Sequence, residues 1–256
     1  MGIGESVKKG FSISKQSMGL VMALFVFGFV WNLISLFYGP QPGAAETPAV
    51  SPILIVAGIV FILLTIFVQA GSLGYVRDKI KKGSAGMAEF MSAGGKYYLR
   101  LLLIGLVVAL VIGVFVLLAA IVVSVLGAKM NVLAIILAIV LASFGIYFVI
   151  LLFLAPYVAV ADEQGVIASI KQSVAKVRKN ILALLGISLI LIAIGFGIGL
   201  LLGAGFAGLS LVIKGMPAQI LFALLSSFVN AYLGLVVTGS FMSFYLALPS
   251  NTPPAE

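Results

Sequence analysis

The sequence contains no cysteine and no histidine. These absences exclude disulfides, thiolate metal sites, cysteine nucleophiles, histidine general bases and histidine-bound zinc or haem. Charged residues are also scarce: they make up 9% of the chain, whereas a soluble domain has about 25%. Hydrophobic residues make up 63% of the 256 residues. An ordinary water-soluble protein is therefore excluded, and we expect a membrane protein with no cofactor and no metal site.

Six stretches of the chain are long and apolar enough to cross a bilayer as helices. A hydrocarbon core of about 30 Å requires about 20 apolar residues in a helix, because each backbone N–H and C=O must be paired without water. The stretches show no alternation of apolar and polar residues, which excludes a membrane β-barrel. We therefore predict an all-α polytopic membrane bundle with spans at residues 18–37, 53–75, 101–126, 132–161, 181–202 and 218–248.

The six spans are expected to form one domain, residues 1–248. It begins with an amphipathic segment at residues 1–17, and a proline-rich tail at residues 249–256 is expected to be disordered. Pro156 is predicted to kink the fourth span or to end it early. In the fifth span, glycines at four-residue spacing indicate a tight helix crossing, and a break around residues 203–208 is the alternative.

Lysine and arginine are distributed unequally between the predicted loops. Thirteen of the 15 lie in the N-terminal segment or in the loops after the second and fourth spans, and only Lys129 and Lys214 lie on the other side. The positive-inside rule makes the basic side cytoplasmic, and an even number of spans places both termini there. We expect a multi-pass protein of the cell membrane. The net charge of +8 describes this basic face, and since no nucleic-acid-binding motif accompanies it, no nucleic-acid partner is expected.

Segments with amphipathic helical periodicity precede the first, third and fifth spans. Apolar residues recur at helical spacing in residues 3–18, 87–98 and 166–181. A shift of 81 residues aligns Ser92 with Ser173 and Gly105 with Gly186. Two interpretations are open. One is three repeated helical hairpins, each led by a cytoplasmic amphipathic helix, since transporter folds often contain repeats. The other is a similarity that arises from lipid-facing composition alone.

Basic residues of the predicted cytoplasmic loops form the first candidate site. An amphipathic helix with cations suits the headgroup region of a membrane, and each Lys or Arg near an anionic leaflet contributes about 1 kcal/mol of attraction. The alternative is that these charges only fix the orientation of the chain. The candidate face for membrane lipids, anionic ones included, or for a protein partner consists of Lys79, Lys81, Lys82, Lys96, Arg100, Lys171, Lys176, Arg178 and Lys179.

The sixth span contains the second candidate site, a stripe of small and polar side chains that includes Ser227, Asn230 and Thr238. Such a stripe usually indicates close helix packing and interhelical hydrogen bonds, and a polar-lined pathway would use the same residues. Asn32 and Gln69 are candidate partners for Asn230. No Asp, Glu, Lys or Arg lies inside any of the six spans, which argues against a proton relay or a buried site for a charged substrate.

Asp162 and Glu163 are the one adjacent pair of carboxylates in the chain. We predict that Asp162 caps the N-terminus of the helix that follows, where the helix dipole favours acidic residues. A metal or phosphate-ester site is the alternative interpretation, but hard metal ions usually need more oxygen ligands than this pair supplies. No catalytic residue is therefore assigned.

The residues around this pair also carry a family resemblance. Residues 154–173, LAPYVAVADEQGVIASIKQS, resemble a signature of prokaryotic six-span proteins that are similar to the membrane domain fused to some glycerophosphodiester phosphodiesterases. The motif covers about twenty residues, and the span layout extends the resemblance over most of the chain. The catalytic domain of that family has no counterpart here, so the resemblance implies a membrane module that handles lipid, senses it or supports a partner, and no enzyme activity.

Two functions from different classes follow from these features. The first is a membrane scaffold or accessory subunit without catalytic machinery, which engages lipid, a protein partner or a second copy of itself. The second is a transporter or lipid-handling protein with an internal cavity. A cavity beside Asn230 favours the second function, whereas a tightly packed interior favours the first.

The predicted orientation can be tested by labelling, because the chain has no cysteine of its own. A single cysteine in place of Lys81 is expected to be protected from membrane-impermeant thiol reagents applied to intact cells, and so is one in the segment around Lys176. A cysteine in place of Lys214 is expected to react, since it lies on the opposite side. Labelling of the first two positions from outside would contradict the orientation.

Overall fold

The computed structural model describes residues 2–39, 52–126 and 131–249. Every regular element in these ranges is an α-helix, and six helices there are long and apolar enough to cross a membrane. This confirms the predicted all-α membrane bundle with six spans. The predicted disordered tail at residues 249–256 lies outside the described residues, except for Pro249.

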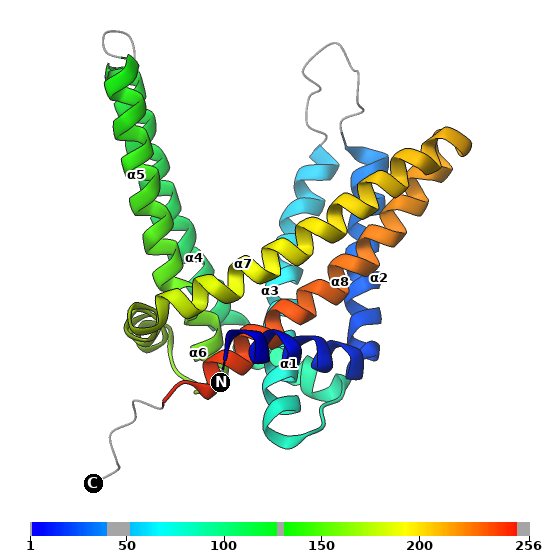
Figure 1. The fold of residues 1–256 in the computed structure, drawn as a ribbon, viewed down its shortest axis with the longest axis horizontal. Coiled ribbons are helices and arrows are strands. Elements are labelled where there is room, and N and C mark those ends of the chain that lie inside the picture. The colour runs from blue at the N-terminus through cyan, green and yellow to red at the C-terminus, as the bar shows by residue number, and fades with distance from the viewer. Residues whose placement is uncertain (1, 40–51, 127–130, 250–256) are drawn as a thin grey trace. The chain divides into compact units, whose positions relative to one another are not determined.

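The helices coincide with the predicted spans and extend beyond several of them (Figure 1). They are α1 (Ile3–Gln16), α2 (Met18–Tyr38), α3 (Pro52–Lys82), α4 (Met87–Leu126), α5 (Asn131–Leu152), α6 (Ala155–Ala161), α7 (Val166–Val212) and α8 (Met216–Ala247). Each predicted amphipathic segment is helical, as α1, as the first turns of α4 and as the first third of α7. The order of elements agrees with three hairpins, and the internal repeat itself stays a prediction.

Two irregularities mark the ends of apolar segments. Phe153 and Leu154 leave the helix between α5 and α6, and Pro156 occupies the first turn of α6, where its missing N–H removes no helical hydrogen bond. In α7, Asn180 has φ −129° and ψ 23°, which kinks the helix where the amphipathic part ends and the apolar part begins. Helix α7 continues through residues 203–208, so the alternative of a helix break there is wrong. The described residues also show no tight crossing, because a Cβ atom added to Gly195, Gly199 or Gly203 would meet nothing within 4 Å.

The described chain separates into two compact units, which are treated one at a time. Unit 1 consists of Met1–Gly95 and Leu185–Glu256, and unit 2 consists of Lys96–Leu184. Unit 1 therefore contains α1, α2, α3, α8, the first turns of α4 and the apolar part of α7. Unit 2 contains the rest of α4, then α5, α6 and the amphipathic part of α7. The expected single domain over residues 1–248 stays a prediction.

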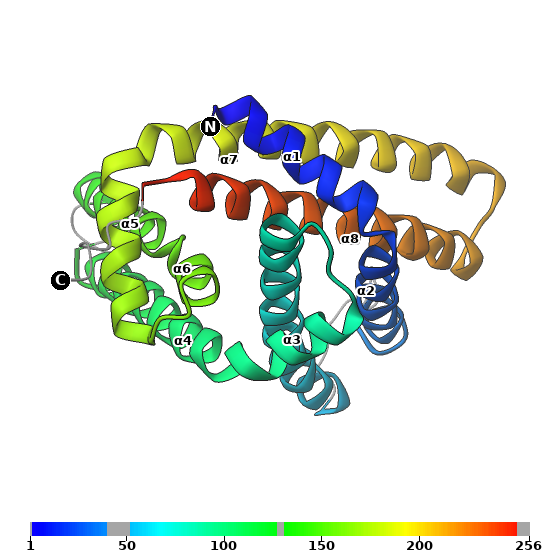
Figure 2. The ribbon, with the colours of Figure 1, turned by 90° about the horizontal axis from the view of Figure 1, so that it is seen from below.

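In unit 1, α1 packs along α8 through small residues (Figure 2). A Cβ atom added to Gly239 would lie 3.1 Å from the Cα atom of Gly10. A Cβ atom added to Gly10 would meet the Ser240 hydroxyl and lie 2.5 Å from the Val236 carbonyl oxygen. Such small side chains allow two helix backbones to approach closely. The buried residues of α1 are Ser6, Val7, Gly10, Ile13 and Ser14.

Helices α2, α3 and α8 of unit 1 pack through aromatic rings. Phe61 of α3 stacks on Phe27 and Trp31 of α2, with ring centroids 4.7 and 4.2 Å away respectively. Phe25 of α2 meets Phe228 of α8 edge to face at 6.0 Å. Rings in these geometries contribute attraction beyond their apolar area, so α2 is fixed between α3 and α8.

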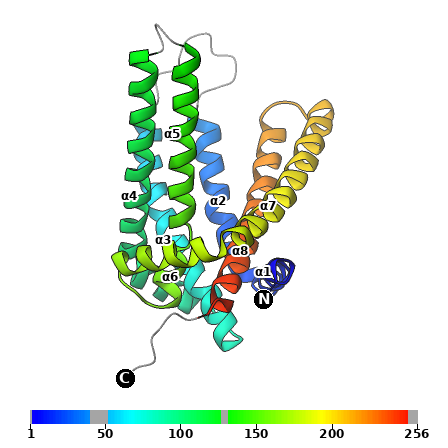
Figure 3. The same cartoon turned by 60° about the vertical axis from the view of Figure 1, so that its left-hand side comes forward.

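In unit 2, α4 and α5 run side by side (Figure 3). Phe115 of α4 stacks on Phe148 of α5 with ring centroids 5.7 Å apart. A Cβ atom added to Gly145 would lie 3.1 Å from Phe115. The absence of a side chain at Gly145 therefore leaves room for the Phe115 ring between the two helices.

The α1–α8 crossing predicts opposite effects for two glycine-to-alanine substitutions in α1. Gly10→Ala is expected to lower the thermal unfolding midpoint of the purified protein, because the new methyl group would overlap the backbone of α8; overpacking of this kind costs about 1–3 kcal/mol. Gly4→Ala is the matched control, since nothing lies within 4 Å of its Cβ position and alanine favours the helix. An equal or higher midpoint for Gly10→Ala would contradict the packing.

Candidate functional site

Two residues of the polar stripe predicted on α8, Ser227 and Asn230, line a pocket in unit 1. The pocket lies between α2 and α8 and has a volume of about 310 Å³. None of its lining residues is ionisable, and three of them have polar side chains. The lining residues are Leu24, Phe27, Gly28, Trp31, Asn32, Ser227, Asn230, Ala231 and Gly234.

The polar groups of this pocket do not pair as predicted. The amide nitrogen Nδ2 of Asn32 donates to the Oγ of Ser227 at 2.7 Å, and that hydroxyl in turn donates to the Ala223 carbonyl oxygen at 2.6 Å. Asn32 therefore lies in the pocket that Asn230 lines but is bound to Ser227. Gln69 is exposed on α3 and does not line the pocket.

Two members of the predicted stripe have different surroundings. The side chain of Asn230 is exposed to the pocket and to the surface, and within residues 2–39, 52–126 and 131–249 it makes no hydrogen bond. Thr238 donates its hydroxyl to the Gly234 carbonyl oxygen at 2.9 Å inside α8 and does not line the pocket. The stripe thus divides into a pocket part, Ser227 and Asn230, and a locally satisfied residue, Thr238.

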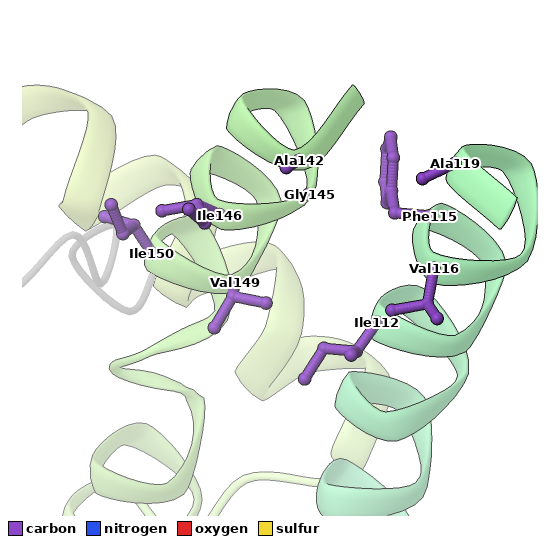
Figure 4. A pocket seen from close by; sticks show the side chains of 9 residues that line it. All are labelled: Ile112, Phe115, Val116, Ala119, Ala142, Gly145, Ile146, Val149 and Ile150. Carbon is purple, nitrogen blue, oxygen red and sulfur yellow. The ribbon is translucent and has the colours of Figure 1, made fainter. Parts of the chain in front are cut away.

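A second pocket lies within unit 2, between α4 and α5 (Figure 4). Its volume is about 430 Å³, and all nine of its lining residues are apolar. Ile112, Phe115 and Val116 line it from α4, and Ile146 and Val149 line it from α5. Lipid tails are as apolar as these side chains, so this pocket offers space for hydrocarbon but no group that could orient a ligand.

The loop between α6 and α7 is held by the start of the unit 2 part of α4. Lys96 Nζ lies 2.8 Å from Oε2 of Glu163, and the Tyr97 hydroxyl donates to Oε1 of the same carboxylate at 2.8 Å. Arg100 donates from NH1 to the Glu163 carbonyl oxygen at 2.7 Å. Tyr97 is fully buried. We call Lys96, Tyr97, Arg100 and Glu163 the loop clamp.

The backbone of the clamped loop is strained at Glu163. This residue has a φ of +54°, a left-handed conformation that costs a non-glycine residue about 1–2 kcal/mol. The three contacts from α4 hold the residue in that conformation. The short spacing of Lys96, Tyr97 and Arg100 places all three near one face of a helix, which is a signal that the sequence contains but that does not identify the acidic partner.

Asp162 lies at the C-terminal end of α6, so its predicted role as the N-cap of the next helix is wrong. Helix α7 begins four residues later, at Val166. The Asp162 carboxylate instead accepts a hydrogen bond from Nε2 of Gln172 at 2.8 Å. Among the described residues, no group of three or more His, Cys, Asp or Glu side chains could hold a metal ion.

Lys176 is the basic residue whose placement differs most from the expected exposed face. It lies in the amphipathic part of α7, before the apolar span, and only 5% of its surface is exposed. Burial lowers the pKa of its amine, and the Asp162 carboxylate opposes that shift. Lys176 is therefore not available to a headgroup at the surface, because α7 turns this position toward the rest of unit 2.

The other residues of the predicted basic face fall into both units. Lys79, Lys81 and Lys82 belong to unit 1, where Asp78 pairs with Lys82 at 2.9 Å and with Arg77 at 2.7 Å. In unit 2, the loop clamp occupies Lys96 and Arg100. The exposed cations of unit 2 for which the described residues provide no ion pair are Lys171, Arg178 and Lys179.

The comparisons with known proteins identify a family but no function. The model of a family described as "Domain of unknown function (DUF7847)" matches residues 1–248. No curated protein and no solved structure matches the chain.

The loop clamp predicts that the hydrogen bond from the buried Tyr97 contributes more to stability than the exposed ion pair does. Tyr97→Phe is expected to lower the free energy of unfolding by about 1–2 kcal/mol, because it removes a bond from a buried hydroxyl to a carboxylate. Lys96→Met is expected to change it much less, because the partners of this ion pair are each about half exposed. Denaturant titration of both variants in the same detergent checks the order, and the reverse order would contradict it.

Proposed function

The chain belongs to the DUF7847 family, and from its geometry we propose that it is a non-catalytic membrane protein that binds anionic lipid through the exposed cations of unit 2. The observation that carries this proposal is the cluster of Lys171, Arg178 and Lys179, exposed and without a carboxylate partner among the described residues. The proposed site is the end of the amphipathic part of α7, next to its apolar span.

The charge balance of unit 2 supports an anionic ligand. Residues 96–184 contain seven Lys and Arg residues against two acidic residues, a net charge of +5 out of +8 for the whole chain. Both acidic side chains are already engaged, Glu163 by the loop clamp and Asp162 by Gln172. The carboxylates of this unit therefore leave its exposed cations available to an anionic ligand.

The positions of the three cations along α7 are those at which a phosphate headgroup is expected. Lys171 and Arg178 are seven residues apart, so they lie on one face of the helix and about 10 Å apart along its axis. Lys179 follows directly, and the kink at Asn180 separates these cations from the apolar part of α7. Cations next to the end of an apolar span lie near the headgroups of a bilayer.

An anionic leaflet fits this arrangement better than an acidic protein partner. The positive-inside rule places this end of α7 at the cytoplasmic leaflet of the cell membrane, which is rich in anionic lipids. The resemblance of residues 154–173 to the membrane domain of some glycerophosphodiester phosphodiesterases also supports lipid as the ligand. A scaffold or accessory role for a partner or a second copy is compatible with lipid binding and is proposed only as its consequence.

The alternative function, a transporter or lipid-handling protein, is favoured by a different observation. An open pocket between α2 and α8 lies beside Asn230, where this alternative requires an internal cavity. That pocket lies in unit 1 and has no ionisable lining residue, so it does not serve the anionic headgroup proposed for unit 2.

Neutralising the three cations is expected to weaken the binding of anionic lipid. The triple variant Lys171→Gln, Arg178→Gln, Lys179→Gln should bind phosphatidylglycerol about 100-fold more weakly than the original protein, because each cation contributes about 1 kcal/mol. Native mass spectrometry of the purified protein, titrated with phosphatidylglycerol or phosphatidylcholine, measures the change.

Lys214→Gln provides the control, since Lys214 is exposed on the side predicted to lie opposite. It should bind phosphatidylglycerol like the original protein. Equal binding of phosphatidylglycerol by the triple variant, or equal affinity of the original protein for both lipids, would refute the proposal.

A further inference from the structure

We infer that the pocket between α2 and α8 binds an uncharged lipid whose hydroxyl or carbonyl group pairs with the Asn230 side chain. This inference concerns unit 1 and is independent of the anionic-lipid proposal. The supporting observations are the unpaired carboxamide of Asn230, the open volume beside it and the chemistry of the residues that line the pocket.

The pocket lies near the middle of two candidate membrane spans, so we expect it deep in the hydrocarbon region. Gly28, which lines it, is ten residues from each end of α2 (Met18–Tyr38), or about 15 Å at the helical rise. Asn230 lies near the middle of α8 (Met216–Ala247). Water is scarce at this depth, and an unpaired polar group there costs several kcal/mol.

Asn230 lacks the hydrogen bonds that such a position demands. The neighbouring polar group, Asn32, is already bound to Ser227, and the Ser227 hydroxyl is bound to the Ala223 carbonyl oxygen. A carboxamide can donate two hydrogen bonds and accept two. A ligand with a hydroxyl or carbonyl group would satisfy at least one of them.

The space beside Asn230 is open on both helices. A Cβ atom added to Gly28 or to Gly234 would meet nothing within 4 Å, so these two glycines leave room over the pocket. The volume of about 310 Å³ exceeds what one water molecule needs. The pocket can therefore hold part of a chain molecule as well as its polar group.

The lining determines the class of ligand. Leu24, Phe27 and Trp31 supply apolar surface beside the amide groups, and no ionisable residue is available to pair with a charged headgroup. Charged and zwitterionic lipids keep their headgroups at the interface, because burying an unpaired charge is prohibitively costly. A neutral lipid with a small hydrogen-bonding group, such as a prenyl alcohol, can place that group at this depth.

The chain carries its own reporter for this pocket. Trp31 is the single tryptophan of the sequence and lines the pocket, so its fluorescence responds to the contents of the pocket. We would titrate the full-length protein in detergent with farnesol, and in parallel with farnesene, which has a similar hydrocarbon chain without the hydroxyl.

Farnesol is expected to change the Trp31 emission saturably, and farnesene should bind at least about tenfold more weakly, as the loss of one hydrogen bond in an apolar site predicts. Asn230→Leu should reduce the affinity for farnesol about tenfold and leave that for farnesene unchanged. Gln69→Leu is the matched control, because it removes an exposed carboxamide of α3 that lies outside the pocket, and it should bind farnesol like the original protein.

Filling the pocket gives a second test that does not alter its polar groups. Gly28→Leu and Gly234→Leu are expected to abolish the saturable signal without loss of folding, because nothing lies within 4 Å of either Cβ position. Gly199→Leu in α7 is the control, since its Cβ position is equally open and it does not line the pocket.

Three outcomes would overturn the inference. They are equal responses to farnesol and farnesene, an unchanged response in both pocket-filling variants that remain folded, and a signal that depends on protein concentration and accompanies dimer formation. The last would identify a second copy of the chain as the partner of Asn230. A result for the triple variant of unit 2 affects none of these outcomes.

Discussion

The absence of hydrogen-bonding solvent in the bilayer core is the constraint on which the rest of this structure depends. Each hydroxyl inside an apolar helix must find its partner within the protein. Ser143 and Thr65 donate to the carbonyl oxygen four residues earlier, at 2.8 Å in both cases. Ser240 does the same at 2.7 Å where α8 meets α1. Each of these hydroxyls thus forms its hydrogen bond within its own helix, and no charged group is involved.

The same constraint makes polar side chains without a hydrogen-bond partner notable. In the described ranges, the buried hydroxyls of Ser17 and Ser243 have no hydrogen-bond partner, and the exposed amide of Asn230 has none either. Asn230 stands beside an open pocket. In unit 2, the charged side chains lie outside the apolar spans. The loop clamp pairs some of them, and Lys171, Arg178 and Lys179 of α7 are exposed.

Much of the fold follows from the sequence, because a run of about 20 apolar residues is itself the requirement for crossing a bilayer. The contacts do not follow in the same way. Helical periodicity predicted an apolar face for the first 17 residues, yet α1 also buries two serines and a glycine, and Gly10 fits against Gly239 and Ser240. Periodicity predicted that Lys176 is exposed. Periodicity gives the position of a residue around the helix axis of α7, but it does not show which face of α7 the rest of unit 2 covers. Ser227 and Asn230 were predicted together, whereas the bond from Asn32 to Ser227 depends on how α2 meets α8.

The contact of α1 with α8 joins two helices that are far apart in the sequence, and this has a consequence for biosynthesis. Proteins emerge from the ribosome with the N-terminus first, so α1 is made long before its binding surface on α8 exists. Until α8 enters the bilayer, the serine and glycine face of α1 has no α8 surface to pack against. The three lysines of α1 are exposed to solvent. Closure of unit 1 is therefore a late event in assembly, and a chain that stops before α8 leaves its first helix without a place to dock.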